Sequence, residues 1–157
     1  MKLGDVMTKS PASCSPETNL AAAVEILWNR NCGVLPIVDL NERLVGIVTD
    51  RDICVALGTR NQLPGEIPVR DVAAAKIVAG KPDDDLRKAL AIMAEAKVRR
   101  LPVVDDAGKL QGIVSIDDIL LRTGAERSAE LSAEDVVRTL RIVHTLRGGG
   151  QAKAAAA

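Results

Sequence analysis

The chain lacks phenylalanine and tyrosine, and Trp28 is its only aromatic residue. It also lacks an excess of either charge, because Lys+Arg and Asp+Glu both number 21. No overall field therefore draws it toward nucleic acid or an anionic membrane. No apolar run approaches the roughly 18 residues that span a bilayer. The N-terminal MKLGDVMTKS has no apolar core of the kind a secretory signal needs, so we expect a cytoplasmic protein without a membrane anchor.

Metal ligands and catalytic groups are equally scarce. Cys14, Cys32 and Cys54 form no CxxC pair, and their odd number at wide spacing predicts reduced thiols. We expect Cys32 and Cys54 in apolar surroundings and Cys14 as an exposed thiol near a cleft. The single histidine, His144, cannot build a metal site with these scattered cysteines. Nothing resembles a P-loop or a nucleophile with its base, so we predict no catalytic residues and no metal.

What the sequence does contain is an internal repeat at a fixed offset of 66 residues. LPIVD at 35–39 falls on LPVVD at 101–105, and GIVTDRDI at 46–53 falls on GIVSIDDI at 112–119. Asp5-Val6 falls likewise on Asp71-Val72. Matches over about 50 residues without a gap indicate a duplication. The predicted boundaries are 3–58 for the first repeat, 59–69 for a linker, 70–124 for the second repeat, 128–147 for a C-terminal helix and 148–157 for a flexible tail.

Each copy has the same predicted order of elements. In the second copy, residues 76–79 read as a strand, and Pro82 with the acidic residues 83–85 opens a helix. Strands at 100–104 and 110–115 follow, and a second helix begins near Ile116. The class is therefore α/β (α+β), with two β-α-β-β-α repeats. Neither copy alone can bury its helices and its sheet, so we expect one body with pseudo-two-fold symmetry.

The most informative pattern is a hydroxyl followed three residues later by an aspartate, where a strand meets a helix. The two pairs are Thr49 with Asp52 and Ser115 with Asp118. One interpretation is a capping box, which satisfies free backbone N–H groups. The same pattern occurs at 132–135, before a helix with no preceding strand. The other interpretation is a ligand site, in which the hydroxyl binds a phosphate or sugar oxygen and the carboxylate accepts ribose hydroxyls. The two interpretations are compatible.

The order and duplication of DVM, LPIVD and GIVTDRDI resemble a pair of CBS domains (the cystathionine-β-synthase type), also called a Bateman module. The resemblance covers about residues 3–124. It implies clefts that bind adenine nucleotides (AMP, ADP or ATP), and less often S-adenosylmethionine or cyclic dinucleotides. The family motif matches 46–52 and 112–118. The resemblance thus implies ribose contacts for Asp52 and Asp118, and ribose or phosphate contacts for Thr49 and Ser115.

The copies differ in their basic residues. Arg99 and Arg100 precede LPVVD, whereas Gly33 and Val34 occupy the equivalent positions of the first copy. These arginines either bind phosphate in one of the clefts or form a solvated strand end. We therefore expect one tight nucleotide site and one weak or empty site, without knowing which cleft receives the arginines.

Further candidates for the ligand site lie in both copies. Asp50 and Arg51 lie between Thr49 and Asp52, and Arg51 is either a phosphate contact or part of a surface ion pair. Because no Phe or Tyr can stack on a base, an adenine has to lie between aliphatic side chains. We expect Ile77 and Val78 to provide them.

A helix is predicted at 128–147, capped by Ser132, with Val136, Leu140 and Val143 as its apolar stripe. We expect a homodimer formed through the apolar segments 53–57 and 119–121, because related modules dimerise through such helices into a flat disc. Nucleic acid is not an expected partner, although an unidentified protein partner is. The predicted function is a regulatory, non-catalytic sensor with no required cofactor. The alternative is an interaction protein whose clefts have lost their ligand.

Overall fold

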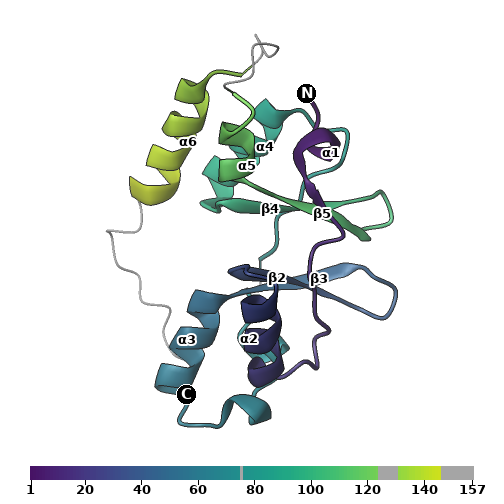
Figure 1. The fold of residues 1–157 in the computed structure, drawn as a ribbon, viewed down its shortest axis with the longest axis vertical. Helices are drawn as coiled ribbons and strands as arrows, with labels where there is room; N and C mark the ends of the chain where they lie inside the picture. The colour runs from purple at the N-terminus through teal and green to yellow at the C-terminus, as the bar shows by residue number, and fades with distance from the viewer. Residues whose placement is uncertain (75, 124–130, 146–157) are drawn as a thin grey trace.

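The computed structural model describes residues 1–74, 76–123 and 131–145. Both repeats contain a helix, a two-stranded hairpin and a second helix, as predicted (Figure 1). The elements of the first repeat are α2 (Leu20–Asn29), β2 (Val34–Val38), β3 (Leu44–Thr49) and α3 (Asp50–Thr59). Those of the second are α4 (Leu86–Ala96), β4 (Arg100–Val104), β5 (Leu110–Ser115) and α5 (Ile116–Leu120). The predicted strands at 100–104 and 110–115 and the junction helix that begins at Ile116 are confirmed at the expected residues.

The shorter elements lie before and between these units. They are α1 (Leu3–Val6), β1 (Thr8–Lys9) and the two 3-10 turns η1 (Pro64–Glu66) and η2 (Val69–Asp71). The predicted strand at 76–79 is wrong. This segment reaches β4 only at Gly80, whose N–H donates to the carbonyl of Pro102 and whose carbonyl accepts from Val104 N–H, both at 2.9 Å. Contact at a single residue gives a bridge to Val103 instead of a strand.

The two hairpin turns bind each other and relate the repeats by a pseudo-two-fold axis. Leu44 N–H donates to the Gly108 carbonyl at 3.0 Å, and Leu110 N–H donates to the Glu42 carbonyl at 3.0 Å. The two bonds are equivalent under the repeat, because Leu110 is the counterpart of Leu44 and Glu42 is the counterpart of Gly108 at the offset of 66 residues. This reciprocity confirms the expectation that the two repeats form one body.

The repeats also exchange their N-terminal segments. Leu3 N–H donates to the Asp84 carbonyl of the second repeat at 2.8 Å, and Val69 N–H donates to the Thr18 carbonyl of the first repeat at 2.8 Å. Figure 1 shows α1 beside α4 and β5, away from the rest of the first repeat. As a result, each repeat is completed by a segment from the other.

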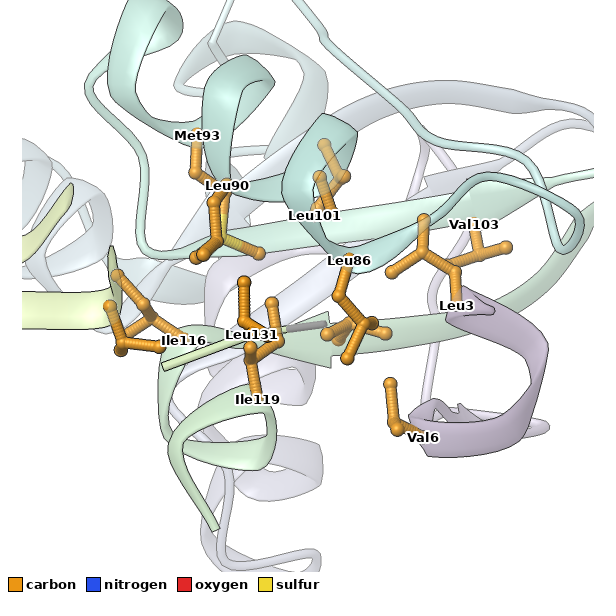
Figure 2. Packing of buried hydrophobic residues seen from close by; sticks show 13 residues of the cluster. Leu3, Val6, Leu86, Leu90, Met93, Leu101, Val103, Ile116, Ile119 and Leu131 are labelled. Atoms are coloured by element: carbon orange, nitrogen blue, oxygen red, sulfur yellow. The ribbon is translucent and has the colours of Figure 1, made fainter. Parts of the chain in front are cut away.

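Two hydrophobic cores reflect this exchange. Leu3 and Val6 belong to the core of the second repeat together with Leu86, Leu101 and Ile119, and Figure 2 shows Leu3 beside Leu86 and Val103. The core of the first repeat takes up Ile67 and Val69, two residues from the end of the predicted linker. The exchanged segments are therefore part of the cores and are not surface additions.

The predicted C-terminal helix is observed as α6 (Ala133–Thr145), and it packs on α4 and α5. Ser132 caps it by accepting a hydrogen bond from Asp135 N–H at 3.2 Å. Val136 and Leu140 pack in the core of the second repeat. Positions 128–130 and 146–147 of the predicted helix lie outside the described residues. Within the described ranges, no helix combines the length and apolar character that crossing a membrane requires.

Candidate functional site

Both strand-to-helix junctions form capping boxes. Ser115 N–H donates to Asp118 Oδ2 at 2.7 Å, and Asp118 N–H donates to Ser115 Oγ at 3.1 Å. Thr49 and Asp52 form the same pair of bonds at 3.0 and 3.2 Å. Ser132 and Asp135 repeat the geometry at the start of α6. The capping interpretation is thus confirmed, and it does not by itself identify a ligand site. What distinguishes the first two boxes from the third is the cleft beside each.

The larger cleft, called here the Ser115 cleft, lies between the start of the first repeat and the junction of the second. Its volume is about 400 Å³. Its second-repeat wall contains Arg100, Ile113, Ser115, Asp117 and Asp118. Its first-repeat wall contains Thr8, Ser10, Pro11, Ala12, Arg30, Asn31, Cys32, Gly33, Val34 and Pro36.

The smaller Thr49 cleft is the pseudo-symmetric counterpart. Its volume is about 190 Å³. It is lined by Gly33, Val34, Ile47, Thr49, Asp50, Arg51, Lys97, Val98, Arg99 and Arg100. Subtracting 66 from its second-repeat residues Lys97 to Arg100 gives Asn31 to Val34, which line the Ser115 cleft. The duplication has therefore produced two related clefts, as the sequence predicted.

Most of the predicted site residues lie in these clefts. The structure brings Thr49, Asp50, Arg51 and Arg99 together in the Thr49 cleft and Ser115 with Asp118 in the Ser115 cleft. Arg100 lines both, so its side chain lies at the boundary between them. Asp52, Ile77 and Val78 are not among the lining residues of either cleft, and Val78 packs instead against the core of the second repeat.

Several lining residues of the Ser115 cleft were missed by the sequence reasoning. Pro11 and Ala12 are the equivalents of Ile77 and Val78, because 66 separates each pair. The offset was thus a usable signal for the apolar wall. Arg30 and Asn31 follow α2 in the first repeat, and no sequence pattern marked them as cleft residues. They reach the Ser115 cleft only because the two repeats pack together.

The CBS domain model matches residues 3–59 and 69–123. The chain belongs to the CBS domain family. The CBS domain-containing protein YhcV of Bacillus subtilis is 34% identical over 125 residues, which are 80% of this chain and 87% of YhcV.

Two of the similar solved structures contain bound ligands. The CBS domain pair of protein MJ0100, in complex with 5′-methylthioadenosine and S-adenosyl-L-methionine, has a TM-score of 0.72 and 27% identity over 81% of this chain and 98% of that one. CBSX2 in complex with AMP has a TM-score of 0.67 and 29% identity, and covers 77% of this chain and 94% of its own.

The two clefts of this CBS pair differ in charge. Four basic residues, Arg51, Lys97, Arg99 and Arg100, face a single acidic residue, Asp50, in the Thr49 cleft. In the Ser115 cleft two basic residues are balanced by two acidic ones, since Arg30 and Arg100 accompany Asp117 and Asp118. The smaller cleft is therefore basic, and the larger one is close to neutral.

Gly33 leaves space for two charged side chains where the two clefts meet. A Cβ atom at this position would lie 2.9 Å from Asp50 Oδ2 and 3.8 Å from an Arg100 guanidinium nitrogen. The missing side chain leaves room for both charged groups above the backbone of residue 33. Asp50 and Arg100 therefore place opposite charges on either side of residue 33.

Two of the three cysteines of the CBS pair, Cys14 and Cys54, are placed differently from the prediction, whereas Cys32 packs against the first core, as expected. Cys14 is buried, because its backbone pairs with β2 through bonds with Pro36 and Val38, and its side chain enters the first core. Burial raises the pKa of its thiol to about 11. Cys54 is exposed, and Cys32 is half-buried in the wall of the Ser115 cleft. The described residues contain no group of three or more side chains suited to hold a metal ion.

These thiols should react in a fixed order near neutral pH. With dithionitrobenzoate we expect Cys54 first, Cys32 more slowly, and Cys14 only after denaturation, because it is buried and its thiolate is disfavoured. The folded chain holds the Cys14 proton more tightly than the unfolded chain. Cys14 therefore makes the free energy of unfolding fall as pH rises from 9.0 to about 11. Reaction of Cys14 as fast as Cys54 in the folded protein would contradict its burial.

Proposed function

We propose that this CBS pair is a non-catalytic regulatory module that binds an adenine nucleotide in the Ser115 cleft. The proposal rests on the volume of this cleft and on Asp118 beside it, whose Oδ1 accepts no hydrogen bond from the described residues. About 400 Å³ falls within the 300–1,000 Å³ typical of small-molecule sites. The Thr49 cleft, at about 190 Å³, is below that range, so it is the weak or empty one of the two.

Asp118 is suited to the ribose. Its capping bonds engage only Oδ2, so among the described residues Oδ1 remains as an acceptor for sugar hydroxyls. Ser115 already donates its hydroxyl to that carboxylate, and it remains an acceptor beside the ligand. The complexes of the MJ0100 CBS pair and of CBSX2 contain adenosine derivatives, which supports the choice of ligand.

The remaining walls match the other parts of a nucleotide. Pro11, Ala12 and Ile113 offer an apolar surface for the base, which needs no aromatic ring from this chain. Arg100 and Arg30 provide guanidinium groups for phosphate, which arginine binds in a bidentate manner. The residues Thr49, Asp50, Arg51 and Arg99 line the second, weaker position, and Asp52 lies next to it through its bonds to Thr49.

Titration calorimetry with adenosine, AMP, ADP, ATP and S-adenosylmethionine tests this function. We expect Asp118→Asn to weaken both adenosine and AMP about tenfold, because a neutral acceptor replaces a charged one. Asparagine keeps the side-chain oxygen that caps α5, so the fold is retained. Asp135→Asn is the matched control, since it alters the same kind of box at a helix that borders neither cleft. It should leave both affinities unchanged.

Two results would refute the assignment. If Asp52→Asn weakens binding and Asp118→Asn does not, the nucleotide occupies the Thr49 cleft. If no ligand of this set binds the parent protein, the adenine-nucleotide function is wrong. That result would favour the alternative of an interaction protein whose clefts have lost their ligand.

A further inference from the structure

Two of the three thiols of this CBS pair lie in one groove. Figure 1 shows α2 and α3 side by side in the first repeat, and the groove between them, called here the α2/α3 groove, has a volume of about 670 Å³. Both Cys32 and Cys54 line it. Cys54 lies on α3 and is exposed, whereas Cys32 follows α2 and is half-buried. Cys14 is buried in the first core and takes no part in this arrangement.

The backbone places the two thiols about one helical turn apart. Asp50, the first residue of α3, donates its N–H to the carbonyl of Gly33 at 3.3 Å, which holds the residue after Cys32 against the start of this helix. Cys54 comes one turn after Asp50, on the same face of α3 and about 6 Å along its axis. Cα atoms joined by a disulfide are typically about 4.4–6.8 Å apart, so this placement is on the scale of a disulfide.

Packing alone does not require thiols at these positions. At the offset of 66 residues, Val98 and Leu120 are the counterparts of Cys32 and Cys54. Val98 packs against the core of the second repeat, and Leu120 is 37% exposed. Two aliphatic side chains therefore suffice for the same fold in the other half of the molecule. What the first repeat adds is the chemistry of two sulfur atoms.

We propose that Cys32 and Cys54 form a reversible redox site, which a peroxide closes into a disulfide within one chain. The thiolate of the exposed Cys54 attacks one oxygen of hydrogen peroxide and breaks the O–O bond. The products are a sulfenic acid and hydroxide, which becomes water with the proton that the thiol released. The thiolate of Cys32 then attacks the sulfenic sulfur and displaces a second hydroxide, which leaves as water in the same way. Two thiols and one peroxide thus give one disulfide and two waters, a transfer of two electrons.

The site also reaches the Ser115 cleft, because Cys32 lines both that cleft and the α2/α3 groove. The disulfide therefore ties one wall of the proposed nucleotide site to α3. This link rests on the proposed function. The redox site itself does not, because no nucleotide takes part in the reaction.

Treatment of the reduced full chain with a small excess of hydrogen peroxide, followed by alkylation in denaturant and mass spectrometry, tests the redox site. We expect two of the three thiols to be lost together, which leaves Cys14 as the one that is alkylated. The intact mass should fall by two hydrogen atoms, and peptide mapping should join the segment that contains Cys32 to the segment that contains Cys54. Dithiothreitol should restore all three thiols.

Three variants separate the roles of the thiols. Cys32→Ser removes the thiol that closes the bond, so the sulfenic acid of Cys54 should persist and be labelled by dimedone, whereas the parent should not be labelled. Cys54→Ser should leave Cys32 reduced under the same treatment, because Cys32 is half-buried. Cys14→Ala is the matched control, since it removes a thiol outside the groove, and it should form the disulfide as the parent does.

The inference is overturned if the parent keeps all three alkylatable thiols after treatment. A disulfide that joins Cys54 of two chains, or oxidation of Cys54 to a sulfinic acid without a bond to Cys32, overturns it as well. None of these measurements uses a nucleotide, so their outcomes are independent of those for the Ser115 cleft.

Discussion

Replacing Leu3 by alanine is expected to lower the free energy of unfolding by about 2–5 kcal/mol, although the residue is third in the chain. Terminal residues usually tolerate substitution because they pack weakly. Leu3 is different, since it is fully buried in the core of the second repeat. Its Cδ1 lies so close to Gly80 that a Cβ there would be 2.5 Å away. Removing it leaves a cavity where the exchanged segment meets α4 and β4.

Chemical denaturation followed by circular dichroism measures this loss. Leu40→Ala is the control, because Leu40 is fully exposed in the first hairpin turn. It should change the unfolding free energy by less than about 0.5 kcal/mol. If the Leu3 and Leu40 variants were equally stable, the N-terminal segment would not contribute to the second core.

Replacing Arg100 by glutamine is expected to weaken AMP about 10- to 150-fold and adenosine very little. A hydrogen bond between a guanidinium and a phosphate is worth about 1.5–3 kcal/mol, and adenosine has no phosphate. Glutamine retains much of the side-chain length and removes the charge. The variant therefore tests phosphate binding in the cleft that the nucleotide occupies.

Arg99→Gln separates the two clefts, because Arg99 lines only the Thr49 cleft while Arg100 lines both. With the nucleotide in the Ser115 cleft, calorimetry should show an Arg99 variant close to the parent. A larger effect at Arg99 than at Arg100 would place the phosphate in the Thr49 cleft. Equal losses for adenosine and AMP in the Arg100 variant would show that Arg100 does not contact phosphate.

The hairpins and junction helices could be predicted because their signals are local. Alternating apolar residues, a turn containing Gly108 and a capping box such as Ser115 with Asp118 each act within a few residues. The exchange of segments could not be predicted in this way. The bond between Leu3 and Asp84 joins residues that are distant in sequence and leaves no periodic pattern. The false strand at 76–79 has the same origin, since an apolar run does not reveal how many of its residues pair.

The site was predictable on one wall only. Ser115 and Asp118 come from the repeated motif, whereas the opposite wall comes from the other repeat and depends on how the two repeats meet. Once that arrangement is known, the offset of 66 relates Pro11 and Ala12 to Ile77 and Val78. The same lack of tertiary information explains the cysteines. Cys14 was expected to be exposed because it falls at the end of a predicted strand near a cleft, yet its backbone pairs with β2 and carries the side chain into a core.

The exchanged N-terminal segments bear on how such a chain could arise. The segment at the start of each repeat fits the core of the other, so one repeat alone cannot complete itself. A shorter ancestor with a single copy would have folded only by lending this segment to a second molecule and receiving one in return. Its stability would then have depended on protein concentration. Fusing two copies in one gene makes the exchange of segments intramolecular, at a high effective concentration. Each half is then free to diverge, as the unequal clefts and the presence of α6 on one half illustrate.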